Sequence, residues 1–589
     1  MNLKTIFAAT LLCAICTNIN GQRILSQTNN KLEQTIQYIE RFYVEKANMD
    51  KIMDKGIVGV LQELDPHSVY IPAKEVEKTN EPLKGNFMGV GIAFKIFKDT
   101  INVMEIIKGG PAEKVGMLPG DKIISIDGQK AYGSDSITNN WVFKKLRGKK
   151  GTKVKIKVIR KNIDDFIEFE VRRDKIPINS VGTYFMVDKN IGYISLQRFS
   201  QSSAEEVRNA IKDLKKQGMK SLIFDLRGNG GGFLEIAGDI CDEFLSDNKL
   251  IVYTEGLTVG RQILKSTRKG EFETGRLVIL IDESSASASE IVSGAVQDHD
   301  RGIIIGRRSF GKGLVQRMFP LADGGQLRLT TSRYYTPSGR CIQKPYNDGL
   351  EAYYNELMNR YNQNELIDPD KIDLPDSVKY YTANKRVVYG GGGIIPDIFV
   401  PIDTTRISDY YIEIRSKGLI NNFALEYANQ NRNMLLEKYP TYEEFDKNYR
   451  KLNITEEFKN YAAKNGIKEN KLRPYWIVDW TAKALNAEIK DTTYNVDGNS
   501  YAEITKKMLE NPKFIEDVIE TAKEEDKKIK EITKKSEIYI NGQIKAAIAG
   551  NLYGTNYYYE AIKEIDEGYK TALEVIKSGR LFRRLNIED

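Results

Sequence analysis

The stretch Ile281–Gln316 reads IDESSASASEIVSGAVQDHDRGIIIGRRSFGKGLVQ, and it says more about the expected fold than any other part of the chain. An apolar run, RLVILID, leads into a serine-rich turn, and the residues after it have the small and apolar spacing of a helix over 287–298. The run GIIIG then predicts another strand. A strand, a helix and a strand in this order indicate layered α/β architecture.

The same alternation continues towards the N-terminus. IGYISL and SLIFDLRG read as strands, with a helix predicted over 203–217 between them and another after the glycines. A strand-rich unit precedes them at 85–173, where Lys153, Lys155 and Lys157 alternate with apolar residues. Strict period two indicates a half-buried strand, and we expect these lysines to form a solvated face of the kind that protects edge strands.

With 589 residues, the chain is too long for one hydrophobic core, so we expect several domains of mixed α/β and α+β character. The apolar run Ile6–Ile15 after Lys4 reads as a signal peptide, which predicts export to the periplasm or out of the cell and no transmembrane span in the mature chain. Cys13 and Cys16 fit a lipoprotein site poorly. The predicted order is a signal peptide at 1–21, a helical segment at 22–84, the strand-rich domain at 85–173, an α/β core at 174–403 with a polar insertion at 346–387, and an α-helical C-terminal domain at 404–589.

Composition and residue spacing argue against some partners and cofactors. The formal net charge, 88 − 81 = +7, is modest for this length and spread along the chain, which argues against nucleic acid as the main partner. Beyond the signal peptide only Cys241 and Cys341 remain, and we expect them to be buried or half-buried thiols without a disulfide framework. No Cys/His or His/carboxylate spacing suggests a metal, and no cofactor is expected.

Ser287 falls at the turn between the predicted strand and helix. A hydroxyl there can be exposed, and the backbone N–H groups of the first helical turn lack partners. Those donors and the helix dipole suit a developing oxyanion, which makes Ser287 a candidate nucleophile. Ser287-Ala-Ser-Glu290 is also a capping box, so a serine that only caps the helix is the competing interpretation.

Lys312, between two glycines, favours the catalytic interpretation. The chain has only two histidines, His67 and His299, and His299 falls at the far end of the predicted helix, where a capping or surface position is expected. A lysine must be neutral to act as a general base, although its reference pKa is about 10.4, and burial among apolar neighbours can supply the shift. Gln316 follows four residues later on the same face, and its uncharged amide can orient the amine.

Two glycine-containing segments admit other interpretations. Gly306–Lys312 fits the G-x-x-x-x-G-K part of a phosphate-binding loop, but Gly313 stands where the Ser or Thr that holds magnesium belongs. Asp225–Gly232, DLRGNGGG, follows a strand and fails the dinucleotide-binding pattern at Phe233. We interpret it as a loop that donates N–H groups to an oxyanion, with a plain tight turn as the alternative.

Taken together, these segments resemble the C-terminal processing peptidases, also called tail-specific proteases. The resemblance covers most of 30–403 and rests on LDPHSVY, PAEKVGMLPGDKIISIDG, DLRGNGGG, SASASEI, SFGKGLVQ, LTTSRYYTPSGR and GGIIPDI, in that order. It implies a serine endopeptidase in which Ser287 is the nucleophile, Lys312 is the general base and Gln316 assists. The core is then expected to be crotonase-like.

The resemblance also implies binding sites beyond the dyad. It assigns the oxyanion hole to the backbone of Ala288 and Gly231. It identifies 85–173 as an inserted PDZ domain that receives the C-terminal tail of a protein by strand addition, at Gly89, Val90, Gly91 and Ile92.

The expected partners are therefore protein or peptide C-termini as substrate. Residues 404–589 are a candidate region for docking an adaptor or forming a homo-oligomer. The competing hypothesis is an envelope scaffold, a PDZ adaptor whose protease domain is inactive. The presence of Ser287, Lys312 and Gln316 argues against it, because a retired site need not keep all three.

Overall fold

The computed structural model describes residues 30–97, 99–160, 163–372, 378–467 and 512–587, so the predicted signal peptide lies outside the described residues. The chain divides into two compact units. The first combines Met1–Thr79 with Gln316–Thr331 and Tyr346–Tyr353, and the second holds Asn80–Val315, Ser332–Pro345 and Tyr354–Asp589. Among the described residues, no helix has both the length and the apolar character that a bilayer crossing requires.

The first unit contains α2 (Met49–Gln62), β1 (Val69–Ile71) and most of α3 (Ala73–Lys84). Asn48 caps α2 by accepting a hydrogen bond from the N–H of Lys51 at 3.0 Å. β1 pairs antiparallel with Gln326–Arg328, the first residues of β18 (Gln326–Tyr335). The predominantly helical character expected before residue 84 is thus present, with one short strand between the helices.

The core of the second unit is a six-stranded sheet in the order β10-β11-β12-β15-β16-β21. β10 runs antiparallel to β11, and the remaining neighbours are parallel. This sheet confirms the α/β layering predicted from the alternation of strands and helices. The strands are β10 (Val181–Met186), β11 (Ile191–Leu196), β12 (Ser221–Asp225), β15 (Leu277–Ile281), β16 (Ile303–Gly306) and β21 (Ile398–Phe399).

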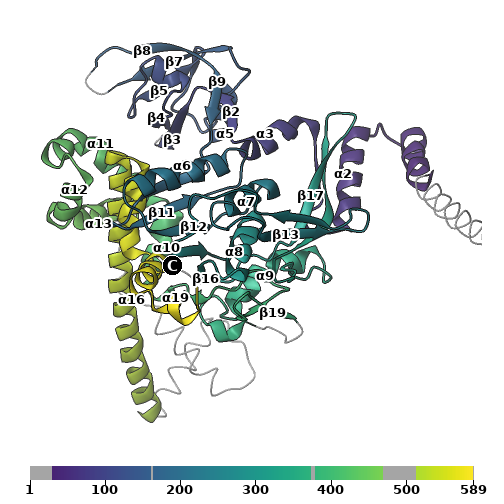
Figure 1. Cartoon of the computed structure of the whole chain (residues 1–589). Coiled ribbons are helices and arrows are strands. Elements are labelled where there is room, and N and C mark those ends of the chain that lie inside the picture. Colours follow the sequence, from purple (N-terminus) through teal and green to yellow (C-terminus); the bar gives the residue numbers. More distant parts are fainter. Residues whose placement is uncertain (1–29, 98, 161–162, 373–377, 468–511, 588–589) are drawn as a thin grey trace, which may run out of the picture. The chain divides into compact units, whose positions relative to one another are not determined.

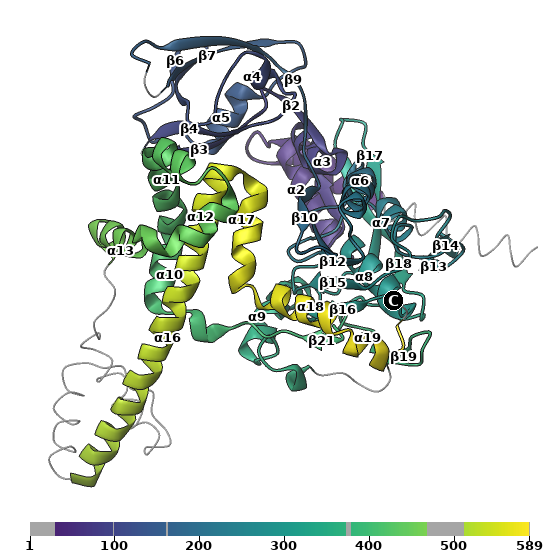
Figure 2. The same cartoon turned by 60° about the vertical axis from the view of Figure 1, so that its left-hand side comes forward.

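Helices cover both faces of this sheet. One face packs against α6 (Ser203–Lys216), α7 (Leu234–Cys241) and α8 (Ala288–Asp298), and their apolar side chains share one core with those of the strands (Figure 1). The other face packs against the last two helices of the chain, α18 (Glu567–Ser578) and α19 (Arg580–Arg584), which lie beside β16 in Figure 2. The helices predicted over 203–217 and 287–298 are confirmed to within one residue at each end, and α7 is the helix predicted after the glycines.

Two smaller sheets complete the region around the core. β13 (Leu250–Glu255) pairs with β14 (Gln262–Lys265) and with Arg333–Tyr335 of β18. The predicted insertion at 346–387 contains α9 (Leu350–Asn362), and its end contributes to a hairpin of β19 (Lys379–Tyr381) and β20 (Val387–Tyr389).

The strand-rich unit predicted at 85–173 is present as a sheet in the order β3-β4-β5-β7-β8 with β6 beside β5. Along β7, exposed and buried residues alternate strictly, which confirms the half-buried strand with a solvated lysine face. The comparison with edge strands is wrong, because β7 lies between β5 and β8. The elements of this strand-rich unit are β2 (Asn86–Gly89), β3 (Ile92–Phe97), β4 (Thr100–Ile106), α4 (Pro111–Lys114), β5 (Lys122–Ile126), β6 (Gln129–Lys130), α5 (Asn139–Leu146), β7 (Lys153–Ile159), β8 (Ile167–Arg172) and β9 (Asp174–Pro177).

The C-terminal region is helical, as predicted, but its helices belong to two different cores. Six of them share a core of their own, which is rich in tyrosine and phenylalanine. These are α10 (Asp409–Ser416), α11 (Leu419–Lys438), α12 (Tyr442–Asn448), α13 (Ile454–Lys464), α16 (Pro512–Tyr553) and α17 (Thr555–Ile562). Helices α18 and α19 instead complete the core sheet, so the C-terminal region does not pack as one separate domain.

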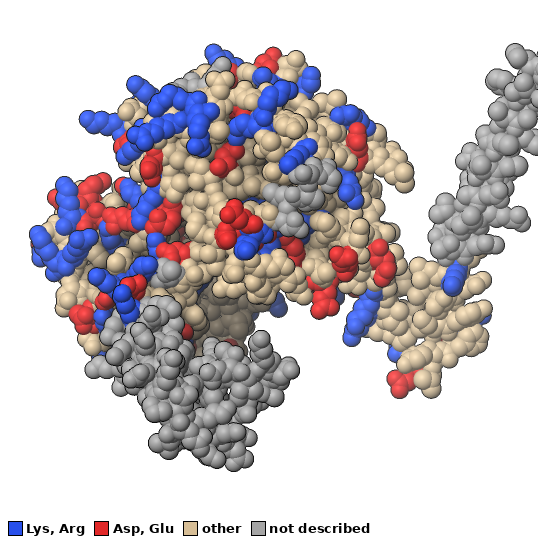
Figure 3. Space-filling view, turned by 90° about the horizontal axis from the view of Figure 1, so that it is seen from below, with Lys and Arg blue, Asp and Glu red and all other residues tan. Residues whose placement is uncertain are grey.

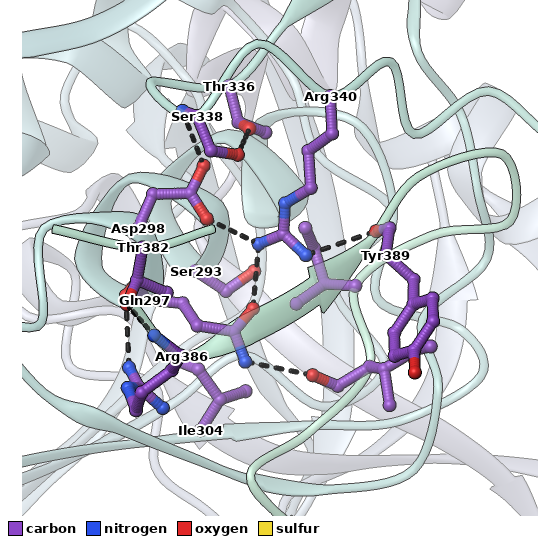
Figure 4. Close-up of polar contacts among 12 residues, drawn as sticks. Ser293, Gln297, Asp298, Ile304, Thr336, Ser338, Arg340, Thr382, Arg386 and Tyr389 are labelled. Carbon is purple, nitrogen blue, oxygen red and sulfur yellow. Dashed lines mark hydrogen bonds and ion pairs between the residues drawn. The ribbon is translucent and has the colours of Figure 1, made fainter. Parts of the chain in front are cut away.

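A buried ionic cluster anchors the C-terminal end of α8 (Figure 4). Arg340 is fully buried, and its Nη2 donates to Gln297 Oε1 and Asp298 Oδ1, each at 2.7 Å. A cation at this end of a helix also meets the negative end of the helix dipole. The cluster therefore fixes α8 at the end opposite to Ser287.

The remaining expectations from composition concern thiols and surface charge. Cys241 is buried and Cys341 half-buried, and both are free thiols, as predicted. On the face shown in Figure 3, Lys and Arg side chains occur together with Asp and Glu side chains, in keeping with charge that is spread along the chain.

Candidate active site

Ser287 lies just beyond the carboxyl end of β15, at the first turn of α8. Its backbone has φ +56° and ψ −112°, which is a conformation that residues with a Cβ rarely adopt. The side chain is half-buried between the buried Ala286 and Ala288. Asp282 shapes the preceding turn by accepting the N–H groups of Ser284 and Ser285 at 3.0 and 3.1 Å. The result is a sharp strand-to-helix turn that holds a serine at its apex.

Glu290, in the first turn of α8, connects this turn to the segment that carries Lys312. Its fully buried carboxylate accepts the N–H of Ser287 at 2.7 Å and the N–H of Lys312 at 2.9 Å. It also accepts the hydroxyl of Ser309 at 2.5 Å and the N–H of Gly311 at 2.7 Å. Burial raises the pKa of Glu290 to about 7, although these hydrogen bonds favour the ionised form.

Lys312 lies in the loop between β16 and β17 (Leu314–Pro320), and its side chain is half-buried. The backbone is held on both sides of it, because Gly311 accepts the N–H of Lys344 at 2.9 Å and Gly313 donates to Gln343 Oε1 at 2.8 Å. A Cβ at position 313 would lie 2.7 Å from the backbone nitrogen of Gln343. Glycine is therefore required for this close approach, which gives the FGKG motif a packing reason.

The glycine loop Asp225–Gly232 reaches the serine turn from β12. The carbonyl of Asn229 accepts the N–H of Ala286 at 3.0 Å and the hydroxyl of Ser289 at 2.8 Å. Gly231 lies directly against the turn, since a Cβ there would be 2.9 Å from the nitrogen of Ala288. The N–H of Gly231 donates to Asn229 Oδ1 at 2.9 Å in this structure.

Gln316 and His67 belong to the first unit, whereas Ser287 and Lys312 belong to the second. The side-chain nitrogen of Gln316 donates to the backbone carbonyl of His67. The His67 ring nitrogen Nε2 lies 2.8 Å from the hydroxyl of Tyr353. His299 follows the last residue of α8 as predicted, and its Nε2 lies 2.6 Å from the carbonyl of Leu250.

The predicted peptide-binding segment lies between β2 and β3. Gly91 has φ +81°, and the carbonyls of Val90 and Gly91 accept the N–H groups of Ala112 and Ile107 at 2.8 and 3.0 Å. Gly89 ends β2 and Ile92 begins β3. β3 is the terminal strand of its sheet, so one side of it is not used by the sheet order. An edge strand of this kind is what addition of a peptide strand requires.

Sequence reasoning missed three residues that the structure brings to this site. The sequence indicates Glu290 as half of a capping box, but it gives no sign of the contact between Glu290 and the loop that carries Lys312. In the sequence Asn229 stands only within a glycine run, although in the structure it holds the loop to the serine turn. Asp566 carries no local signal at all, because its partner Arg227 is 339 residues away.

Three segments of the chain match models of known families. Residues 190–352 match peptidase family S41, residues 89–174 match the PDZ domain, and residues 410–494 match a family of unknown function. The first two matches define a PDZ-containing serine protease.

Comparison with individual proteins narrows the class of protease to which the chain is similar. The chain is 36% identical over 333 residues to a carboxy-terminal-processing protease of Bartonella bacilliformis, with 54% of this chain and 75% of that protein covered. It is 33% identical over 368 residues to the carboxy-terminal processing protease CtpA of Bacillus subtilis, with 62% and 77% covered. The solved photosystem II D1 C-terminal processing protease is 23% identical, with 63% of this chain and 92% of that chain covered and a TM-score of 0.33.

The chain therefore belongs to the carboxy-terminal processing proteases of peptidase family S41. This confirms the resemblance seen in the sequence motifs. The adaptor hypothesis is not favoured by these matches.

Proposed function

We propose that the protein is a serine endopeptidase that uses Ser287 as nucleophile and Lys312 as general base. The observation that carries this proposal is the bridge through Glu290, whose carboxylate accepts the N–H groups of both residues. One buried group thus fixes the backbone under the hydroxyl relative to the backbone under the amine. Such preorganisation is what a nucleophile and its base require.

In the proposed reaction, neutral Lys312 takes the hydroxyl proton of Ser287 as Oγ attacks the peptide carbonyl carbon. The N–H groups of Ala288 and Gly231 donate to the oxyanion. The ammonium of Lys312 then gives its proton to the leaving amine as the C–N bond breaks, which leaves an acyl-enzyme that water hydrolyses. Because the N–H of Gly231 donates to Asn229 in this structure, oxyanion binding requires that N–H to be shared or released.

Gln316 is proposed to orient the amine of Lys312 through its uncharged amide. A carboxylate at this position would favour the charged ammonium, whereas an amide leaves the base neutral. Gln316→Glu is therefore expected to lower kcat more than Gln316→Ala, and equal losses in the two variants would contradict an orienting role.

The test of the dyad compares wild type with Ser287→Ala and Lys312→Ala on an unfolded protein substrate. Each variant is used at equal folded concentration, established by circular dichroism. Ser284→Ala is the matched control, because Ser284 is an exposed serine in the same turn. We expect cleavage to be lost in the two dyad variants and kept in the control. Undiminished cleavage in either dyad variant would contradict the mechanism, and failure of a serine-directed probe to label the wild type would favour an adaptor.

Substrate selection is proposed to begin at the PDZ domain, where a C-terminal tail adds to the edge of β3 and its carboxylate meets Gly89–Ile92. Peptides that differ only in a free or amidated C-terminus test this directly. We expect amidation to raise KM at least tenfold with little change in kcat. An equal KM for the two peptides would contradict recognition of chain ends.

The wider setting is also part of the proposal. We infer a crotonase-like arrangement for the core sheet and its helices, and export of the mature protein after removal of residues 1–21. N-terminal sequencing of the mature protein tests the second point. Docking of an adaptor or a second copy through residues 404–589 stays a prediction, which light scattering on the intact protein and on a mixture with a captured adaptor would test.

A further inference from the structure

The last helices of the chain are part of the protease core. Tyr569, Ile576 and Phe582 are buried against the same cluster as Ile223 and Leu280, which lie on central strands of the core sheet. Arg276 Nη1 donates to the carbonyl of Ile576 at 2.8 Å, which fixes α18 at its C-terminal end as well. We call residues 566–587 the C-terminal arm.

The arm begins with Asp566, whose carboxylate binds Arg227 of the glycine loop. Asp566 caps α18 by accepting the N–H of Tyr569 at 3.1 Å. Its two oxygens also accept Arg227 Nη1 at 2.8 Å and Arg227 Nη2 at 2.7 Å, a bidentate pair. The approach is close, because a Cβ at Gly568 would lie 3.0 Å from Arg227 Nη1.

Asp225, the last residue of β12, binds Arg227 from the other side. Its Nη2 donates to Asp225 Oδ2 at 2.6 Å and its Nε to Asp225 Oδ1 at 3.0 Å. Asp225 is itself held by the hydroxyl of Tyr193 at 2.7 Å. The guanidinium is thus fixed between the core sheet and the arm, and its side chain is only 25% exposed.

The residues that follow Arg227 lead directly to the serine turn. Gly228 donates to Asp282 Oδ1 at 3.0 Å, and the carbonyl of Asn229 accepts the N–H of Ala286. Gly231 then lies against Ala288. A shift of Arg227 therefore changes the starting point of the loop that places the Gly231 N–H.

We propose that Asp566 is a positioning residue for catalysis, which acts through Arg227 to hold the glycine loop in register with the Ser287 turn. The inference rests on the proposed function and deepens it. The C-terminal arm, which lies outside the matched peptidase segment at 190–352, is then a required part of the site.

The charges of this pair are stable across the pH range of an assay. Burial opposes charge on Arg227, but Asp225 and Asp566 raise its pKa well above the ordinary value. Burial likewise opposes charge on Asp566, yet Arg227 lowers its pKa overall. A loss of activity in an Asp566 variant is therefore expected at every pH at which the wild type works, with no shift in the pH profile.

The test compares Asp566→Asn with Glu567→Gln in the full-length protein. Glu567 is the first residue of α18 and binds Arg406 and Lys570, so it controls for loss of charge from the arm. We expect Asp566→Asn to lower kcat about tenfold with KM within twofold, and to weaken binding of a peptidyl boronate about as much. Asp566→Glu should recover part of kcat, and Glu567→Gln should stay within twofold of wild type.

Several outcomes would overturn the inference. They are an unchanged kcat in Asp566→Asn, a change in KM alone, or an equal loss in Glu567→Gln. If Asp566→Asn does not fold, Gly568→Ala keeps both charges and displaces Arg227 Nη1, and we expect kcat to fall about threefold. An unchanged kcat in that variant would likewise overturn it.

Hydrogen–deuterium exchange separates this inference from the proposed function. Faster exchange of the amides of 228–232 in Asp566→Asn than in Glu567→Gln is expected whether or not the enzyme cleaves a given substrate. Equal exchange in the two variants contradicts the positioning role. Absence of cleavage by wild type would instead contradict the proposed function.

Discussion

Two carboxylates support the candidate active site, one from nearby in the chain and one from far away. Glu290 is three residues from Ser287 and fully buried, and its carboxylate accepts three backbone N–H groups and one hydroxyl, all uncharged donors. Asp566 is 339 residues from Arg227 and faces a cation. The pKa of Glu290 is therefore raised to about 7, whereas the pKa of Asp566 is lowered. The charge of Glu290, the support nearby in the chain, therefore changes near physiological pH, whereas Asp566, the distant support, stays charged.

Of the two supporting carboxylates, Glu290 should have the larger effect on activity when its charge is removed. Glu290→Gln places an NH₂ group among four donors, so at least one buried N–H or hydroxyl loses its acceptor. We expect kcat/KM to fall about 100-fold, more than for Asp566→Asn. Steady-state kinetics and the labelling rate of a fluorophosphonate probe measure this.

Glu283→Gln is the control for that variant. Glu283 is half-buried, lies in the same turn and binds Arg307 at 2.7 Å. It should change kcat/KM less than threefold. A loss as large as that of Glu290→Gln would mean that any acidic residue in the turn matters, and the comparison between the two supports would lose its basis.

The next prediction concerns the pH dependence of activity and stability, which should differ between Glu290 and Asp566. At pH 6, about one unit below the pKa of Glu290, roughly nine-tenths of this group is protonated, so we expect about tenfold lower kcat/KM than the plateau. Stability should move the opposite way. The folded-state pKa is above the ordinary value of about 4.3, so the folded protein binds the proton more tightly, and the free energy of unfolding falls as pH rises from about 4 to about 7.

Urea unfolding at a series of pH values measures the slope. Glu290→Gln should remove this component, and Asp566→Asn should leave it in place. The Asp566 component has the other sign: its stabilisation is present above the ordinary pKa of about 3.9 and is lost as pH falls below it. The assignment would be contradicted if the free energy of unfolding of the wild type rose between pH 4 and 7 and Glu290→Gln removed that rise.

A smaller effect is expected for Tyr334→Phe. The buried hydroxyl donates to the carbonyl of Ser287 at 3.2 Å, but that carbonyl also accepts the N–H groups of Glu290 and Ile291. Its loss should therefore lower kcat about threefold at most, with KM unchanged. A loss comparable with that of Glu290→Gln would show that the serine turn depends on the tyrosine as much as on the carboxylate.

The smallest effect sets the baseline for an exposed carboxylate. Lys157 and Glu168 pair across β7 and β8 at 3.3 Å, with each side chain 46% exposed. Water and salt screen such pairs, so Glu168→Gln should leave both kcat and the melting temperature unchanged within error. A measurable loss would indicate that the lysine face of β7 has a role beyond solvation.

The same contrast explains what the sequence predicts and what it does not. The strand–helix alternation and the serine turn follow from local periodicity, so β12, α8 and β16 are found with their ends within three residues of the prediction. The position of β7 depends on which strands pair, and the lysine pattern cannot distinguish an edge strand from an interior one. Likewise, the helical pattern near residue 570 predicts a helix but not the sheet face that buries Tyr569.

Among site residues the limit is also distance along the chain. Ser287 and Lys312 stand out because their types and neighbours suit chemistry within 25 residues. The second contact of Glu290 depends on how the loop at 309–312 folds back, and the contact of Asp566 depends on the packing of the whole arm. Gln316 falls in the other compact unit, so its spacing from Lys312 in sequence gives no distance between the two side chains.

The backbone of Ser287 has a consequence for how the protein is handled in the laboratory. At φ +56° a residue with a Cβ costs about 1–3 kcal/mol, whereas glycine adopts this conformation freely. That relief exceeds the roughly 0.5–1 kcal/mol that glycine loses through its freedom in the unfolded chain. Ser287→Gly should therefore melt at a higher temperature than Ser287→Ala or wild type, which makes it the better inactive variant for trapping a bound tail.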